Sequence, residues 1–268
     1  MRLDDLRALV IDVDGVLWRG RQALPGVAAF FDFLHARHIA YLIVTNNSAR
    51  PETDVVERLA RMGVPIEAHR VLTSSRATAL SLPRLAPHAR RILVVGSEWL
   101  TGVLAQAGYD IVEQDADAVI VGIDWHLTYE KLKRATREIR RGALFIGTNA
   151  DTTYPAEEGI VPGTGAIIAA LQAASEQSPI IIGKPERTMF DLAVETMGAS
   201  PEVTATLGDR LETDIEGGHR AGLKSILVLT GITTREMLQH SPIQPTWVFD
   251  DLIALRRAWE SACERPAA

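Results

Sequence analysis

The sequence has few of the features that mark secreted, membrane-spanning or nucleic-acid-binding proteins. It contains one cysteine, Cys263, so no disulfide can form within the chain, as is typical of a reducing compartment. The N-terminal segment MRLDDLR is charged where a secretory signal would be apolar. The longest apolar runs, such as GAIIAALQAA, are too short to span a bilayer. We therefore expect a soluble, cytoplasmic protein with no membrane partner.

Basic excess and histidine clusters are also missing. The net charge is −6 with both signs scattered along the chain, so we expect no nucleic-acid partner. None of the seven histidines stands at a metal-ligand spacing. No G-x-G-x-x-G follows an apolar run, which argues against dinucleotide binding.

What is present indicates an α/β protein. The chain has 268 residues, 47% of them apolar, enough for one large domain or two smaller ones. Short runs that are apolar on both faces predict parallel strands covered by helices: RALVI, AYLIV, RILVV, AVIVG, ALFIG, PIII, TATL and SILVL. Amphipathic segments between them predict helices over 26–37, 53–62, 128–141, 165–176, 187–197 and 252–263. The pattern predicts a doubly wound parallel sheet of Rossmann-like type.

Polar residues follow four of the predicted strands. RALVI ends at Asp12, AYLIV at Thr45 and Asn46, PIIIG at Lys184 and TATLG at Asp209. In an open parallel sheet, ligands bind beyond the carboxyl ends of the strands, so we expect these side chains at one crevice. The first two ends lie far from the last two in sequence. We therefore predict a core domain of residues 1–82 and 180–268 with an inserted α/β cap domain of residues 83–179, reached through a linker at 82–90. One continuous large sheet is the alternative.

The acids at this crevice suit phosphoryl chemistry. Asp12 and Asp14 stand two apart before Gly15, which lets the chain turn. One carboxylate can attack an electrophile while the other gives a proton to a leaving group. Lys184 offers a point charge for an anionic group.

The remaining polar strand ends fit the same chemistry. Thr45 and Asn46 offer a hydroxyl and amides that suit anionic oxygens. Asp12, Asp14 and Asp209 need a counter-ion, and ligand sets made only of oxygen suit Mg²⁺ rather than Zn²⁺. Asp214 either ligates the metal through water or positions Lys184. Taken singly, each of these residues is equally ordinary as a helix cap or a solvated loop residue.

Four motifs in this order, DVDGVLW, TNNS, GKP and GDRLETDIEGG, resemble those of the haloacid dehalogenase superfamily. Two segments of the predicted insert, VGIDWHLTYEKL and GTNADTTYP…GIVPGTGAI, resemble the cap of its NagD-like or nitrophenylphosphatase branch. The resemblance covers nearly the whole chain. It implies a phosphatase that hydrolyses a small phosphorylated metabolite through an aspartyl-phosphate.

The resemblance also implies roles. Asp12 is the nucleophile and Asp14 the general acid and later the base, while Thr45 and Lys184 hold the phosphoryl group. The Mg²⁺ ligands are the side chains of Asp12 and Asp209 and the backbone carbonyl of Asp14, with Asp214 supporting the metal shell. Caps of this branch often dimerise, so a homo-oligomer formed through the cap is one option, and the oligomeric state is open.

Two other functions on a similar fold compete. A receiver-type signalling domain also uses an aspartate, a threonine, a lysine and an acidic metal pair, but it has no acid two residues after the nucleophile and needs no large insert. A dehalogenase needs neither Mg²⁺ nor a general acid, which leaves Asp14 and Asp209 unexplained. A non-catalytic binding protein would not need all of these residue types.

The substrate's identity is open. Sugar phosphates, nucleotides, glycerol phosphates, phosphoglycolate and pyridoxal phosphate all fit the core motifs. Asn149, Asp151 and Tyr154 of the insert are the residues that we expect to line the cap and to bind the substrate, with solvated turns as the alternative. Trp18 either covers the site or packs in the core.

Overall fold

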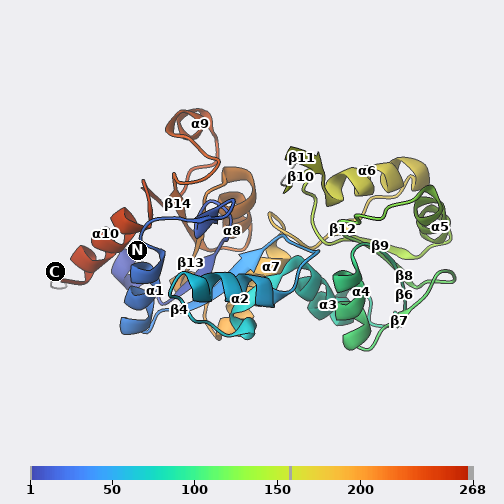
Figure 1. Cartoon of the computed structure of the whole chain (residues 1–268), viewed down its shortest axis with the longest axis horizontal. Coiled ribbons are helices and arrows are strands. Elements are labelled where there is room, and N and C mark those ends of the chain that lie inside the picture. Colours follow the sequence, from blue (N-terminus) through green and yellow to red (C-terminus); the bar gives the residue numbers. More distant parts are fainter. Residues whose placement is uncertain (1, 157–158, 265–268) are drawn as a thin grey trace. The chain divides into compact units, whose positions relative to one another are not determined.

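A computed structural model of the chain describes residues 2–156 and 159–264. The chain divides into two compact units (Figure 1). Unit 1 takes in the described residues up to Thr45, then Glu52–Leu72, and those from Pro185 onward. Unit 2 comprises Asn46–Pro51 and Thr73–Lys184, so the predicted insert of residues 83–179 falls wholly within it. The exact limits 82/83 and 179/180 stay a prediction.

A six-stranded sheet forms the centre of unit 1. Its spatial order is β15 (Trp247–Phe249), β14 (Lys224–Val228), β13 (Thr204–Gly208), β1 (Ala8–Ile11), β4 (Ala40–Thr45) and β5 (Val71–Thr73). The register of β1 is parallel to both neighbours, with Ile11 opposite Leu207 on one side and Ile43 on the other. After β1 the chain adds β4 and β5 on one side of β1, and it later adds β13, β14 and β15 on the other side. This reversal is a topological switch point, where doubly wound sheets bind their ligands.

Helices cover both faces of this sheet (Figure 1). The helices of unit 1 are α1 (Val27–Ala36), α2 (Glu52–Arg61), α7 (Arg187–Met197), α8 (Glu216–Arg220), α9 (Arg235–His240) and α10 (Leu252–Glu264). Alternate strand residues such as Leu9 and Ile11 share one buried cluster with Phe30 of α1 and Trp259 of α10. The other helices against the sheet include α7, which contacts β1 and β4 and packs on α8. Because both faces are covered, β1 is buried at every position.

Unit 2 has a parallel sheet of its own. Its order is β12 (Ile180–Ile181), β9 (Leu144–Gly147), β8 (Ala118–Val121), β6 (Arg91–Val95) and β7 (Asp110–Ile111). The helices of this unit are α3 (Ser74–Leu85), α4 (Glu98–Gln106), α5 (Tyr129–Arg140) and α6 (Thr164–Ser175). α5 and α6 pack together over a cluster that includes Val95, Val121, Ile139 and Leu171. The class is therefore α/β throughout, as predicted, with a Rossmann-like core and an inserted α/β cap.

The structure corrects one part of the predicted topology. All eight predicted strands and six predicted helices are present, but β12 does not join the sheet of β1, β4 and β13. It pairs with β9, with Ile181 opposite Gly147. The expectation of four polar strand ends on one sheet was therefore wrong for Lys184. An apolar run of this kind fits any buried parallel sheet, so its composition could not choose between two.

The predicted linker at residues 82–90 is irregular only in its second half. Helix α3 continues through Pro83 to Leu85, and the Ala86 N–H donates to the Leu82 carbonyl at 2.8 Å. A proline in the last turn removes one hydrogen bond of the helix without preventing the turn. The helices α3, α4, α8 and α9 were not predicted.

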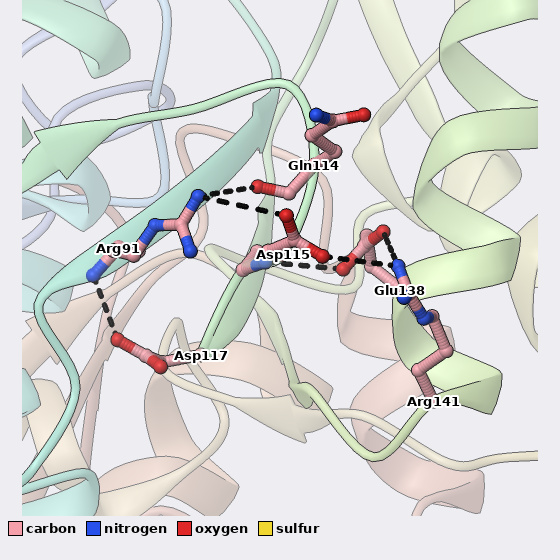
Figure 2. A network of polar contacts seen from close by, with 7 residues as sticks. Arg91, Gln114, Asp115, Asp117, Glu138 and Arg141 are labelled. Carbon is pink, nitrogen blue, oxygen red and sulfur yellow. Dashed lines mark hydrogen bonds and ion pairs between the residues drawn. The ribbon is translucent and has the colours of Figure 1, made fainter.

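A polar network fixes the starting edge of the cap sheet (Figure 2). Glu138 of α5 is buried, and its carboxylate accepts the Ala116 N–H at 3.0 Å and an Arg141 N–H at 3.2 Å. Asp117 Oδ2 accepts the backbone N–H groups of Arg90 and Arg91 at 2.7 and 2.8 Å. These acids satisfy backbone donors where β6 and β8 begin, so the strands start at fixed positions.

Two short antiparallel strand pairs lie outside the two parallel sheets. β2 (Trp18–Arg19) pairs with β3 (Gln22–Ala23), and β10 (Thr153–Ala156) pairs with β11 (Gly159–Pro162). Among the helices described, none combines the length and the hydropathy that a bilayer crossing needs.

Candidate active site

Three acids meet at the carboxyl ends of β1 and β13 in unit 1. Asp12 directly follows β1, Asp209 directly follows β13, and Asp214 lies in a π-helical turn, Leu211–Ile215. Carboxylate oxygens of the three lie within 4.8 Å of one another. Asp209 and Asp214 are each 1% exposed. The prediction that Asp12 and Asp209 lie close together at the carboxyl ends of neighbouring strands is thus confirmed.

The backbone around these acids holds them tightly. The Asp12 N–H donates to the Leu207 carbonyl at 2.9 Å, which extends the pairing of β1 and β13 by one residue. The Arg210 N–H donates to Asp214 Oδ2 at 3.1 Å. At Gly208 a Cβ would lie 2.2 Å from the Asp214 Cβ, so only glycine allows this approach. The geometry of the acids is therefore set by main chain, not by flexible side chains.

The residues present fit a hard divalent cation. Three carboxylates this close in a buried setting repel one another strongly unless a positive charge lies among them. Their donors are oxygens only, the set that Mg²⁺ prefers. The oxygen-only donor set of half-buried Asp12 and buried Asp209 and Asp214 therefore matches a magnesium centre better than a zinc centre.

Asp14 lies outside that group and is oriented separately. Gly15 takes φ +83°, a left-handed conformation that suits glycine, so the chain turns directly after Asp14. The exposed Asp14 side chain accepts the indole N–H of Trp18 at 3.0 Å. The Arg58 guanidinium stacks 4.0 Å over the same indole ring. Burial lowers the pKa of Arg58, and the nearby Asp14 carboxylate acts in the opposite sense.

Trp18 therefore has two roles, whereas the sequence left open whether it covers the site or packs in the core. It packs in the core, with 4% of its surface exposed, and its N–H fixes the carboxylate of Asp14. No pattern in the sequence announces this bond, because the two residues meet through a turn and not through a helix or strand register.

Thr45 is the last residue of β4 and is buried in unit 1. The next residue, Asn46, already belongs to unit 2. The predicted threonine–asparagine pair therefore stands where the chain passes from one compact unit to the other. The chain returns at Lys184, the last residue of unit 2 before Pro185.

Within unit 2, Asn46 and Lys184 are joined directly. Asn46 Oδ1 accepts the Lys184 N–H at 2.8 Å, and Asn46 Nδ2 donates to the Lys184 carbonyl at 3.0 Å. Asn46 Nδ2 also lies 3.2 Å from Asp151 Oδ2. Lys184 is 5% exposed, and at Gly183 a Cβ would lie 2.7 Å from Asn46 Oδ1. The main chain of the GKP motif is thus held by an amide of the TNNS motif.

The three predicted cap residues differ in accessibility. Asn149 is 3% exposed; its Nδ2 donates to the Asn46 carbonyl at 2.8 Å and its Oδ1 accepts the Asp151 N–H at 3.1 Å. Tyr154 lies on β10, where its ring meets that of Trp125 edge-on at 5.3 Å between centroids. Trp125 is 50% exposed. The structure thus adds an aromatic partner that the sequence analysis had not named.

A further segment near the acids was also missed. The loop Thr230–Thr233 follows β14, and its Ile232 N–H donates to Asp209 Oδ2 at 2.6 Å. The pattern that identified the other strand ends, an apolar run followed directly by a polar residue, is present here too, since SILVL is followed by Thr230 and Gly231.

Known proteins resemble the chain over almost its full length. The sequence model described as haloacid dehalogenase-like hydrolase matches residues 9–110, and one described as HAD-hydrolase-like matches residues 181–255. An acid sugar phosphatase of Staphylococcus saprophyticus is 36% identical over 251 residues, 93% of this chain and 96% of that protein.

Solved structures agree with the sequence comparison. A 4-nitrophenylphosphatase from Thermotoga maritima has a TM-score of 0.90 at 37% identity, covering 95% of this chain and 98% of the other. NagD from E. coli K-12 has a TM-score of 0.87 at 32% identity, covering 92% and 97%. The chain therefore belongs to the haloacid dehalogenase-like hydrolases and is a phosphatase of their NagD-like branch.

Proposed function

We propose that the protein is a Mg²⁺-dependent phosphatase that hydrolyses a small phosphomonoester through an aspartyl-phosphate on Asp12. The observation that carries the proposal is the group of Asp12, Asp209 and Asp214, whose carboxylate oxygens lie within 4.8 Å of one another. A nucleophile among metal-binding carboxylates, at the switch point of a parallel sheet, suits in-line attack on phosphorus.

In the first half of the reaction, a carboxylate oxygen of Asp12 attacks phosphorus. A P–O bond to Asp12 forms as the P–O bond to the leaving group breaks. Asp14 gives its proton to the departing oxygen, and the Trp18 indole N–H keeps the Asp14 carboxyl oriented for this transfer. The product alcohol leaves, and phosphate remains on Asp12.

In the second half, Asp14 acts as the base. It takes a proton from a water molecule that attacks the aspartyl-phosphate, which restores the Asp12 carboxylate and releases inorganic phosphate. Its two roles are linked, because the proton given in the first half is recovered in the second.

Bound Mg²⁺ would supply the positive charge that lets a carboxylate approach an anionic phosphoryl group. Asp12, Asp209 and the Asp14 carbonyl would hold it, with Asp214 supporting the shell. Thr45, the Asn46 backbone and Lys184 are proposed to bind the phosphoryl oxygens, with Lys184 as the point charge. The motif resemblance supports these roles for Lys184 and Asn46.

The cap is proposed to select the substrate. Asp151 and Tyr154 would contact the leaving group. Buried Asn149 would act indirectly, through its hydrogen bonds to the Asn46 carbonyl and the Asp151 N–H. Because relatives are named acid sugar phosphatase, sugar phosphates stand first among the substrates to try. A homo-oligomer formed through the cap and a cytoplasmic location both stay predictions.

The test measures phosphate release from 4-nitrophenyl phosphate and from a panel of sugar phosphates, nucleotides and glycerol phosphates. The wild type should be active with Mg²⁺, inactive after EDTA and restored by added Mg²⁺. Ca²⁺ should inhibit, because its looser coordination misplaces the attacking oxygen. Asp12→Asn should keep the fold and lower kcat by more than about 1,000-fold, since an amide does not attack phosphorus. Full activity in metal-free buffer, or near-normal turnover by pure Asp12→Asn protein, would refute the proposal.

A further inference from the structure

The loop Thr230–Thr233 of unit 1 has no part in the mechanism above, yet it contacts two of its components. It follows β14, whose last residue is Val228, and Thr230 and Gly231 are partly buried. Ile232 is 59% exposed, so the loop is not held in place by burial of that side chain. Its main chain and the Thr230 hydroxyl make the contacts that matter.

The first contact is with Asp209. The Ile232 N–H donates to Asp209 Oδ2 at 2.6 Å, and the Thr233 N–H donates to the Asp209 carbonyl at 3.1 Å. A hydrogen bond from a fixed backbone donor to an ionised carboxylate is short and strong, so it sets the rotation of that carboxylate. The loop thereby orients the acid that the proposed function assigns to the metal.

Glycine makes this contact sterically possible. At Gly231 a Cβ would lie 1.7 Å from Asp209 Oδ2, and at Gly15 it would lie 2.4 Å from the same oxygen. The Gly15 position also faces the Gly231 Cα at 2.9 Å. Two backbone segments from distant parts of the sequence therefore close on one carboxylate oxygen, and neither leaves room for a side chain.

The second contact is with the turn after the catalytic aspartates. The Thr230 hydroxyl donates to the Gly15 carbonyl at 2.5 Å. The Arg19 guanidinium in turn donates to the Thr230 carbonyl. Thr230 is thus the side-chain link between the loop that orients Asp209 and the turn that carries Asp12 and Asp14.

We propose that Thr230 is a positioning residue, which through its hydroxyl keeps the Asp12–Gly15 turn and Asp209 in one fixed relation. This inference rests on the proposed function for its catalytic consequence. Misplacement of a reacting group by about 1 Å can cost about 100-fold in rate, so one hydroxyl that locks two loops together can control turnover.

The test compares Thr230→Val, which keeps the shape but removes the donor, with Thr230→Ser, which keeps the donor. Thr230→Val should lower kcat by about 10- to 100-fold with KM within threefold of the wild-type value. It should also weaken Mn²⁺ binding to the substrate-free protein, measured by calorimetry, by about fivefold or more. Thr230→Ser, which keeps the hydroxyl, should have a kcat and a Mn²⁺ affinity within about threefold of the wild-type values. If Thr230→Val does not fold, Thr230→Ala removes the same donor without added bulk.

The matched control is Thr234→Val. That hydroxyl accepts the Met237 N–H at 3.1 Å as the N-cap of α9, so its loss should lower stability and leave kcat and Mn²⁺ affinity unchanged. Unchanged kcat and Mn²⁺ affinity in Thr230→Val protein, or equal losses in Thr230→Ser, would overturn the inference. Failure of the proposed function would look different, because the wild type would then lack Mg²⁺-dependent activity while the Mn²⁺ affinities would still decide the role of Thr230.

Discussion

The side-chain amide of Asn46 pairs with the main chain of Lys184 as a neighbouring strand would. Its Oδ1 accepts the Lys184 N–H at 2.8 Å and its Nδ2 donates to the Lys184 carbonyl at 3.0 Å. A carboxamide carries both a donor and an acceptor, which is what pairing with a peptide unit requires. The main chain of Lys184 is therefore held in position by the side chain of a residue 138 positions earlier in the sequence.

Replacing Asn46 by aspartate should disrupt this pairing selectively. Aspartate can still accept the Lys184 N–H, but it cannot donate to the Lys184 carbonyl and brings a second negative charge toward Asp151. A lost hydrogen bond of this kind costs about 1–2 kcal/mol, so kcat/KM for 4-nitrophenyl phosphate should fall by about tenfold or more.

The control for this prediction is the double variant Asn46→Asp with Asp151→Asn. The amide introduced by the second substitution could donate to the new carboxylate, so part of the lost kcat/KM should return. An Asn46→Asp protein with wild-type kinetics would show that the pairing does not matter for turnover.

Asp14→Asn should separate the two halves of the reaction. 4-Nitrophenolate leaves without a proton, so attack by Asp12 can continue, whereas water attack on the aspartyl-phosphate loses its base. Steady-state turnover should fall by about 100-fold or more, and phosphate should accumulate on the protein. Acid quenching with labelled substrate measures that adduct. A variant that turns over normally, or one that slows without any adduct, would contradict the assigned roles.

Tyr154→Ala should change substrate choice more than chemistry. The tyrosine ring and Trp125 form an aromatic pair on the cap, and loss of one ring removes about 1 kcal/mol of contact with a ring-bearing leaving group. Relative kcat/KM among sugar and aryl phosphates should shift by about three- to tenfold, while acetyl phosphate changes little.

Tyr129→Ala is the matched control, because Tyr129 is also on the cap and is 82% exposed. Identical substrate ratios in the wild type and Tyr154→Ala would place the specificity surface elsewhere in unit 2.

Asp117 should stabilise the cap in a pH-dependent manner. Backbone N–H groups of Arg91 and Arg90 hold the pKa of Asp117 below its ordinary value. A lowered pKa in the folded state means that the stabilisation is full above the unfolded pKa of about 4 and is lost as the pH falls through the folded value. Asp117→Asn should therefore lower the free energy of unfolding at pH 7, measured by urea denaturation, by about 1 kcal/mol or less since the side chain is exposed.

The difference between Asp117→Asn and the wild type should shrink as the pH is lowered below about 4. Asp32→Asn, an exposed aspartate of α1, serves as the control in unit 1. A difference that grows on acidification would have the wrong sign and would exclude this explanation.

Much of this molecule is predictable from residue patterns because its strands are short, apolar on both faces and followed by polar ends. Asp12 and Asp209 could be placed at one edge because parallel strands align their carboxyl ends. The sheet that β12 joins could not be predicted, since two parallel sheets present the same apolar environment. The bonds of Trp18 to Asp14 and of Thr230 to Gly15 depend on turns whose geometry arises only in the folded chain.

The division of the chain at Asn46–Pro51 has an evolutionary consequence. This six-residue segment is covalently flanked by unit 1 but belongs to unit 2, where Ser48 Oγ accepts the Ile123 N–H at 3.3 Å and the Ser48 carbonyl accepts the Ser75 hydroxyl at 2.7 Å. Residues 83–179 are therefore not a detachable cassette. A chimaera that grafts a foreign cap between those limits would mismatch the contact of Ser48 with Ile123 and the pairing of β12 with β9. Cap exchange between relatives therefore requires that segments 46–51, 73–82 and 180–184 travel with the insert.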